Sequence, residues 1–329
     1  MSRRRLLPAA ALALALGVSG CAATSDPTAP PADAAGTDGA GSADRTGQAG
    51  GTTGRDPVAL ALADGVRRPA GPRQAARMLV AAEDAIAGPA TGSARLRTAG
   101  HLAQVVYREI GEHPGWDRRV HAAVPRRLHR VLDHNVASRR EFRSMHYTLS
   151  DTLPAWRIVE PAPARVLMRS YREAERRFGV DWEYLAAINV VETATGRIRG
   201  TSVAGAQGPM QFMPATWAAY GRGDVDDPHD AIQAAGRYLQ AMGFRSGPGG
   251  AGARATALYR YNNHMAYVRG VTHLAQVMQQ RPRAFLGYRA WEVYYLSAAG
   301  DVLLPVGYDH DEPVPVRRYV RNHPQDPRA

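Results

Sequence analysis

The segment from Asp181 to Gly196 constrains the fold most, because it predicts a helix that has no polar face. Nearly every residue from Tyr184 to Val191 is apolar, which is typical of a helix surrounded by protein on all sides. Asp181 fits the N-cap of this helix, and Gly196 fits the position that stops it. We therefore expect a mainly α-helical protein with this helix in its core.

Glu192 is the single charged residue of this helix beyond its first turn. It follows Leu185 by seven positions and Ile188 by four, so it shares their face. It also lies in the last turn, where the helix dipole disfavours a carboxylate. Burial and the dipole both raise the pKa of such a group, and an acid that stays protonated near neutral pH is what general acid catalysis requires. The alternative is a side chain that bends out to solvent or pairs with Arg197 or Arg199.

Residues 1–20 have the pattern of an export signal, with a basic start, an apolar run and small residues at the end. The apolar run is too short for a comfortable transmembrane helix. Residues 18–21 resemble the bacterial lipobox, in which the cysteine, here Cys21, is lipidated and becomes the mature N-terminus. We therefore expect an extracytoplasmic lipoprotein that faces the cell wall from the membrane. An ordinary signal peptide with a chance cysteine is the alternative.

Residues 21–57 and 58–155 differ sharply in composition. The first stretch is rich in small and polar residues and lacks aromatic residues, which predicts a disordered tether. The second has helical periodicity at 77–82, 102–107 and 125–136, and no motif in it carries chemistry. We interpret its basic residues as a solvated helix face, with a wall-binding surface as the alternative. These residues are Arg118, Arg119, Arg126, Arg127, Arg130, Arg139, Arg140 and Arg143.

Further helices are predicted at 161–179, 253–261 and 266–280. Asp227 followed by Pro228 is a strong helix start, with Asp227 as the N-cap. Towards the C-terminus, two strand-like runs at 291–296 and 302–306 predict a β-hairpin with a turn of four or five residues. From Asp309 the tail is charged and rich in proline, so we expect it to be loose.

Four short motifs occur in a fixed order between residues 160 and 280. They are Glu192-Thr193, residues 205–217 (GAQGPMQFMPATW), residues 227–232 (DPHDAI) and Tyr261-Asn262. Together they resemble the soluble-type (SLT) lytic transglycosylases, which are lysozyme-like enzymes of the bacterial wall. The helical region before them and the ending at 304–308 resemble the lipoprotein type found in actinobacteria. The resemblance implies a lysozyme-like catalytic domain at 156–284, after the helical region and before a hairpin and tail at 285–329.

By position, the resemblance implies that Glu192 is the catalytic acid and base. It also implies that the glycan is contacted by Thr193, Met210, Gln211, Tyr261 and Asn262. Core packing is the alternative for Met210, and the amides of Gln211 and Asn262 have backbone groups as alternative partners. Next to the Tyr-Asn pair the sequence departs from the family's pattern, at Arg260, Asn263 and His264.

The implied reaction cleaves the β-1,4 bond between N-acetylmuramic acid and N-acetylglucosamine in peptidoglycan and forms 1,6-anhydro-N-acetylmuramic acid. Glu192 would first protonate the leaving oxygen and then take the proton from the C6 hydroxyl, which attacks the anomeric carbon. Because this attack is intramolecular, one carboxylate is enough. A muramidase that uses water and a catalytically silent peptidoglycan-binding lipoprotein stay open as alternatives.

The net charge of +11 favours anionic partners, but the export signal argues against nucleic acid. Asp224, Asp226 and Asp227 lack the spacing of an EF-hand, so we interpret them as loop and cap residues. The sequence has no His/Cys cluster of the paired-ligand kind. We therefore expect no metal ion, no cofactor, and a monomer whose partners are glycan strands and, through Cys21, the membrane.

Overall fold

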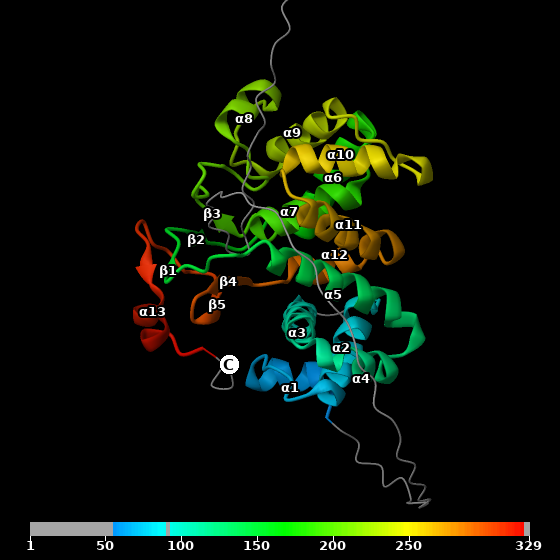
Figure 1. Cartoon of the computed structure of the whole chain (residues 1–329), viewed down its shortest axis with the longest axis vertical. Coiled ribbons are helices and arrows are strands. Elements are labelled where there is room, and N and C mark those ends of the chain that lie inside the picture. The colour runs from blue at the N-terminus through cyan, green and yellow to red at the C-terminus, as the bar shows by residue number, and fades with distance from the viewer. Residues whose placement is uncertain (1–54, 90–92, 326–329) are drawn as a thin grey trace, which may run out of the picture.

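The computed structural model describes residues 55–89 and 93–325. In this part of the chain the fold is mainly α-helical, as predicted, with three small antiparallel strand pairs on one side (Figure 1). The helices of the N-terminal half are α1 (Pro57–Asp64), α2 (Pro72–Ala87), α3 (Ser93–Glu112), α4 (Asp117–Ala123), α5 (His129–Ser144) and α6 (Ala164–Phe178). Those that follow are α7 (Trp182–Thr193), α8 (Pro214–Tyr220), α9 (Pro228–Ala241), α10 (Ala251–Tyr261), α11 (Met265–Gln280), α12 (Ala284–Arg289) and α13 (Val316–Asn322). The strands are β1 (Thr152–Leu153), β2 (Arg157–Ile158), β3 (Ile198–Arg199), β4 (Val293–Ser297), β5 (Gly300–Leu304) and β6 (Val314–Pro315).

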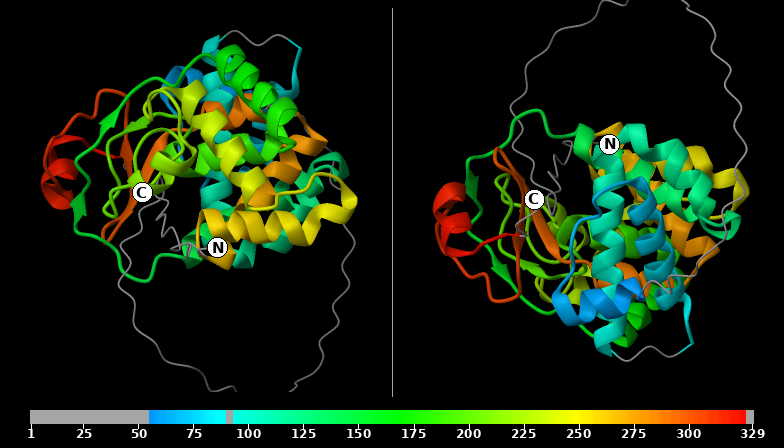
Figure 2. Two further views of the ribbon diagram at one scale, coloured as in Figure 1. Left: turned by 90° about the horizontal axis from the view of Figure 1, so that it is seen from above. Right: turned by 90° about the horizontal axis from the view of Figure 1, so that it is seen from below.

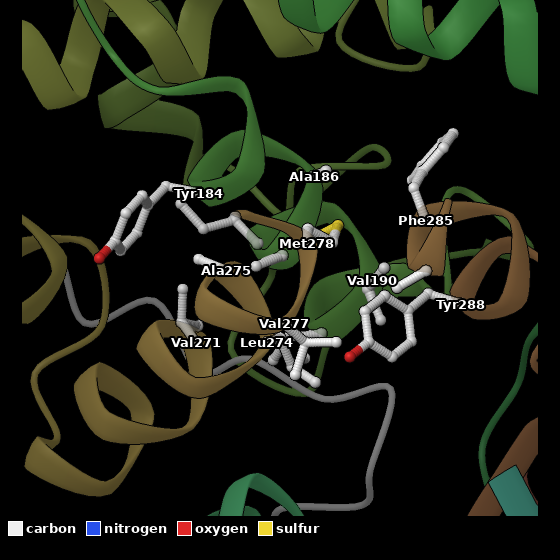
Figure 3. Close-up of a cluster of buried hydrophobic side chains, with 14 of the residues drawn as sticks. Tyr184, Ala186, Val190, Val271, Leu274, Ala275, Val277, Met278, Phe285 and Tyr288 are labelled. Carbon is white, nitrogen blue, oxygen red and sulfur yellow. The ribbon is translucent and has the colours of Figure 1, made fainter. Parts of the chain in front are cut away.

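Helix α7 lies in the core, as its apolar sequence predicts. Its residues are buried except Glu183, which lies in the first turn. Helix α11 packs against α7 on one side and against α5 on the other. Figure 3 shows Val190 of α7 among the apolar side chains of α11 and beside Tyr288 of α12. Because α7 buries apolar side chains on all sides, its position in the core is fixed, and so is the position of Glu192 in its last turn.

The N-terminal helices share a hydrophobic core with the helices that follow them. One continuous cluster of buried side chains extends from Val58 of α1 to Tyr288 of α12. Across the α5–α11 contact, Ser138 donates to the backbone carbonyl of Gly270 at 3.0 Å. A Cβ atom on Gly270 would lie 2.5 Å from the ring of Phe142, so the small residue lets the two helices approach closely. The division into a region at 58–155 and a domain at 156–284 stays a prediction.

Helix α7 stops at Ala194, two residues before the predicted stop at Gly196. Its C-cap is Ala194, with φ of 50°, and Thr195 follows with φ of 63° before Gly196 with φ of 86°. The turn is held because the backbone N–H groups of Ala194 and Thr195 donate to carbonyls of α7. The Thr193 hydroxyl accepts from the N–H of Gly196 at 3.0 Å. Two residues other than glycine therefore occupy the left-handed region directly after Thr193, the last residue of α7.

The predicted C-terminal hairpin is present as β4 and β5, but its turn is tighter than expected. Ser297 pairs with Gly300, so only two residues connect the strands. Gly300 has φ of 99°, a conformation that favours glycine. A small second core lies beneath this side of the molecule, and it includes Leu153, Ile198, Val293 and Leu304.

Within the described residues 310–325 the tail forms a strand and a helix, so the expectation that this part would be loose was wrong. Strand β6 pairs with β1, with Thr152 opposite Pro315, and α13 follows directly. Val316 and Tyr319 of α13 are buried in the second core. In both views of Figure 2, α13 and the strands lie together on one side of the helical body.

Five of the eight basic residues of the N-terminal helices are exposed, as a solvated helix face predicts, namely Arg118, Arg119, Arg126, Arg127 and Arg130. Arg127, Arg140 and Arg143 pair with carboxylates at 2.7 to 2.9 Å. Arg139 is 8% exposed and pairs with Asp301 of β5 at 3.4 Å, which contradicts a solvated position for this residue. In the described ranges 55–89 and 93–325, no helix has the length and apolar character needed to cross a bilayer.

Candidate active site

Glu192 is buried at the C-terminal end of α7, where the sequence places it. The residue is 1% exposed, and its Oε1 accepts a hydrogen bond of 2.7 Å from the hydroxyl of Tyr267 on α11. Its Oε2 has no hydrogen-bond partner among the described residues. Burial raises the pKa of Glu192 to about 8, and the bond from Tyr267 lowers it in part. The carboxyl group is therefore an acid that holds its proton at neutral pH.

The competing interpretation of Glu192, in which it pairs with a nearby arginine, is wrong. Arg197 is buried and its nearest carboxylate is that of Glu292, at 3.6 Å. Arg199 donates to the backbone carbonyl of Asp226 at 2.8 Å. Both arginines follow the left-handed turn, which carries the chain away from the end of α7. The pKa shift of Glu192 comes from burial and Tyr267, with no contribution from a charged neighbour in the described part of the chain.

Thr193 holds the following loop against α7. Its hydroxyl donates to the carbonyl of Pro209 at 2.6 Å, and the side-chain amide of Asn189 donates to the same oxygen at 2.8 Å. Tyr171 of α6 fixes Asn189 through a bond of 2.6 Å to its side-chain oxygen. Thr193 is fully buried, so the structure gives it a role in placing the loop beside Glu192.

Met210 and Gln211 lie in a tight turn that Gln207 and Phe212 close with two backbone hydrogen bonds. Gln211 has φ of 50°, and its side-chain amide donates to the carbonyl of Gly208 at 3.0 Å. That bond matches the alternative in which this amide satisfies a backbone group. Met210 is 0% exposed and belongs to the core, as its packing alternative predicts. A Cβ on Gly208 would lie 1.9 Å from the carbonyl oxygen of Val225, so glycine is required for this turn.

Tyr261 and Asn262, at the end of α10, lie next to the turn that contains Met210. The Tyr261 hydroxyl donates to the carbonyl of Met210 at 2.7 Å, and its ring lies parallel to that of Tyr267, with centroids 6.4 Å apart. Asn262 is the C-cap of α10 and is 3% exposed. Its side-chain nitrogen has no hydrogen-bond partner in the described part of the chain. Three of the four motifs, Glu192-Thr193, residues 205–217 and Tyr261-Asn262, are thus joined by these hydrogen bonds, whereas Asp227 contributes a helix cap.

Tyr267 is the residue of this site that the sequence analysis missed. It lies 75 positions after Glu192 and outside the four motifs. A buried tyrosine needs a partner for its hydroxyl, and Tyr267 stands between Ala266 and Val268 at the start of an apolar helix face. That signal was available in the sequence, but it does not name the partner.

The Asp227 interpretation as an N-cap is confirmed, since its carboxylate accepts from the N–H groups of His229 and Asp230 at 2.8 and 3.0 Å. Asp227, His229 and Asp230 each offer a ligand atom within 4.8 Å of the others. Both ring nitrogens of His229 already face carboxylates, those of Asp230 at 3.1 Å and Glu173 at 3.3 Å. Capping and ion pairing therefore account for this exposed cluster. Cys21, the expected lipidation site, lies outside the described residues.

Comparison with known proteins identifies the part of the chain that holds this site. Residues 169–283 match the model of the transglycosylase SLT domain, and this range contains Glu192, Tyr267 and the four motifs. No curated protein and no solved structure matches the chain. The matched range, its helical fold and the buried acid at the end of α7 agree, so residues 169–283 are similar to the transglycosylase SLT domain in sequence and in their mainly α-helical fold.

Proposed function

We propose that the protein is a lytic transglycosylase that cleaves peptidoglycan between N-acetylmuramic acid and N-acetylglucosamine. The observation that carries the proposal is the isolation of Glu192. Its pKa is set by burial and by Tyr267, and no second carboxyl group among residues 55–89 and 93–325 contributes to it. A hydrolase of the two-carboxylate type uses a second carboxylate to activate water or to attack the sugar. A single acid suits a reaction whose nucleophile belongs to the substrate.

In the proposed mechanism Glu192 acts twice. Protonated Glu192 donates its proton to the glycosidic oxygen while the bond from that oxygen to the anomeric carbon of the muramic acid breaks. The resulting carboxylate then removes the proton from the C6 hydroxyl of the same sugar, and the C6 oxygen bonds to the anomeric carbon. The 1,6-anhydro ring forms, and Glu192 is protonated again. Tyr267 keeps Oε1 occupied, which leaves Oε2 to exchange the proton with the substrate.

The products of digestion test the proposal directly. We expect mass spectrometry of purified wall treated with the protein to show anhydro-muropeptides, which are lighter by one water than the products of hydrolysis. Products that carry only a reducing-end muramic acid would assign the protein to the muramidases. Failure of the wild-type protein to cleave any wall or peptide-free glycan would instead support a binding lipoprotein.

The substitution Glu192→Gln tests the role of the acid. We expect it to lower wall lysis by about 10²- to 10⁴-fold, the range typical of a lost general acid, while the far-ultraviolet circular dichroism stays unchanged. Glu183→Gln is the matched control, because Glu183 lies on the same helix but in its first turn. Equal lysis by the Glu192→Gln variant and the wild type would contradict the assignment.

We further propose, from the sequence of residues 1–21, that the protein is exported and anchored by a lipid on Cys21. In cells treated with globomycin, which blocks the lipoprotein signal peptidase, we expect the unprocessed form to accumulate. A Cys21→Ala variant should leave the membrane fraction. Normal processing of that variant would indicate an ordinary signal peptide.

A further inference from the structure

A second cavity lies outside the SLT segment, where the N-terminal and C-terminal parts of the chain meet. Its volume is about 450 Å³, within the range of small-molecule sites. One wall comes from the end of α1, the link to α2 and the helix α3. The opposite wall comes from β4, β5 and the chain after α13, which Figure 1 shows running back towards α1. We call it the flank cavity, and it is lined by residues of 64–68, 101–109, 294–305 and 319–325.

A network of buried polar groups holds the two walls of the flank cavity together. Arg108 of α3 forms an ion pair with Asp301 of β5, and its guanidinium lies over the ring of Tyr294, 4.6 Å from the centroid. His101 shares a hydrogen bond of 2.7 Å with the Tyr294 hydroxyl. Burial and the neighbouring arginines lower the pKa of His101 to about 4, so its ring is neutral at physiological pH. The cavity is therefore formed before any ligand arrives.

The inner surface of the flank cavity is largely apolar, and its charges are mostly paired. Val66, Val105 and Leu303 contribute aliphatic side chains. Arg68 pairs with Glu109 at 3.1 Å, and Arg108 with Asp301. An ion that entered alone would have to compete with these pairs. A ligand that carries one positive and one negative group, both at the rim of the cavity, does not compete with the Arg68–Glu109 and Arg108–Asp301 ion pairs.

Two charged side chains that line the flank cavity are exposed and have no ion-pair partner among the described residues. They are Asp64, at the end of α1, and Arg67, three positions later. Because the chain turns at Gly65, which has φ of 83°, an acidic and a basic group lie on one short segment of the wall. An ammonium group suits the first and a carboxylate suits the second.

We propose that the flank cavity binds a short peptide that carries both a free amino group and a free carboxylate. Asp64 accepts from the ammonium, Arg67 donates to the carboxylate, and the apolar lining takes the aliphatic part between them. If the proposed function holds, the ligand is a peptide stem of peptidoglycan, held apart from the site that cleaves the glycan. The regions on both sides of the SLT segment would then serve recognition of the substrate.

Titration calorimetry with the tetrapeptide L-alanyl-γ-D-glutamyl-meso-diaminopimelyl-D-alanine tests this proposal. We expect the full chain to bind the tetrapeptide with its L-alanyl nitrogen acetylated, as that nitrogen is acylated in the wall. Binding should be about fivefold weaker when the diaminopimelyl amino group is also acetylated, and about fivefold weaker when the terminal D-alanine is amidated, the effect of one partly exposed charge pair. Asp64→Asn should weaken binding of the tetrapeptide about fivefold and abolish the discrimination against acetylation. Arg67→Gln should do the same for amidation. Both side chains are exposed and unpaired, so the variants should fold.

Arg73→Gln and Asp311→Asn are the controls, because both side chains are exposed and neither lines the flank cavity. Absence of tetrapeptide binding by the wild type, or binding that neither Asp64→Asn nor Arg67→Gln changes, would overturn the proposal. Cleavage of peptide-free glycan is measured in parallel. A wild type that cleaves this glycan but does not bind the tetrapeptide would refute the flank cavity alone. A wild type that binds the tetrapeptide with the expected discrimination but cleaves no glycan would refute the proposed function alone.

Discussion

Tyr267 reaches the carboxyl group of Glu192 from a helix 75 residues further along the chain, and this single bond tunes the acid. A hydroxyl that donates to a carboxylate favours its charged form, so it lowers the pKa that burial raises. If Glu192 must be protonated at the start of the reaction, wall lysis should fall as the pH rises through about 8.

Removing that hydroxyl should move the alkaline limb of the pH profile upwards. In Tyr267→Phe the charged form of Glu192 loses its donor, and a hydrogen bond to a charged group is worth about 1.5–3 kcal/mol. Since each pH unit corresponds to about 1.4 kcal/mol, we expect the alkaline limb of kcat/KM against pH to shift upwards by about one to two units. Tyr261→Phe is the control, because its hydroxyl bonds to the carbonyl of Met210. A limb that stays in place in Tyr267→Phe would refute the coupling.

Glu192 should also make folding stability depend on pH. Its pKa is about 8 in the folded protein and near 4.5 in the unfolded chain, so the folded state binds the proton more tightly. This contribution to stability is complete below about pH 4.5 and is lost as the pH rises to about 8, by several kcal/mol at most, at about 1.4 kcal/mol per pKa unit. The variant Glu192→Gln has no proton to lose. We therefore expect urea unfolding to show that the free energy of unfolding of Glu192→Gln, relative to that of the wild type, is higher at pH 9 than at pH 5.

At the scale of elements, the docking of the hairpin depends on one carboxylate. The carboxylate of Asp301 on β5 is 4% exposed and lies between Arg108 of α3 and Arg139 of α5. Burial alone would raise the pKa of Asp301, but the two guanidinium groups outweigh it and hold the pKa below its ordinary value. The hairpin is therefore attached to the N-terminal helices by charge as well as by apolar contact.

The variant Asp301→Asn should be strongly destabilised. It removes the counterion of Arg108 and leaves Arg139 with only Glu112 at 3.9 Å. Breaking a buried pair from one side costs about 3–5 kcal/mol. Urea unfolding at pH 7 measures the loss, with Asp311→Asn, an exposed carboxylate of the tail, as the control. For the wild type, the stabilisation from Asp301 should disappear as the pH falls below the ordinary range of an aspartate. A variant as stable as the wild type would show that apolar contact alone docks the hairpin.

The helices could be predicted from the sequence, whereas the short strands could not. Helices α7 and α9 carry their own signals, an apolar run in one and the cap at Asp227 in the other. Strands β1 and β6 are two residues each and pair Thr152 with Pro315, so no local pattern marks them. The end of α7 was misplaced because two residues other than glycine adopt the left-handed conformation before Gly196. That choice reflects tertiary contacts, which override local propensity.

The candidate site also contains one residue that could be predicted from the sequence and one that could not. Glu192 could be found because a lone carboxylate in an apolar helix stands out in any sequence. Its partner Tyr267 could not be assigned, because the packing of α11 against α7 decides which hydroxyl meets which carboxyl. Sequence patterns show which face of a helix is buried, and they do not show what covers it.

At the scale of the whole molecule, the segment that matches the family model shares its hydrophobic core with the N-terminal helices. Its last helix, α11, is covered by α5, and Tyr288 of α12 donates to Asn135 of α5 at 2.8 Å. Arg281, just after α11, reaches Glu83 of α2 at 3.3 Å. Removal of the N-terminal helices would expose this apolar surface and leave polar groups of the core without partners.

A fragment of residues 156–284 should therefore fail to fold cooperatively on its own. We expect its thermal melt, followed by circular dichroism, to lack the single sharp transition of the chain at 55–329, and we expect it to bind the dye ANS. The burial of apolar side chains between α5 and α11 gives the physical reason. A fragment that melts in one transition and binds no dye would show that α11 is stable without α5.

The left-handed turn after α7 lowers the free energy of unfolding, and it also fixes the end of the helix that carries the Glu192 carboxyl group. Ala194 and Thr195 have positive φ without being glycine, and such residues cost about 1–3 kcal/mol each. The net stability of a typical domain is about 5–15 kcal/mol, so this strain is a sizeable fraction of it. Glycine at either position would relieve the strain, but it would also loosen the end of the helix that carries Glu192. Selection for thermal stability alone would favour glycine at positions 194 and 195. Selection for a fixed position of the Glu192 carboxyl group favours the present residues.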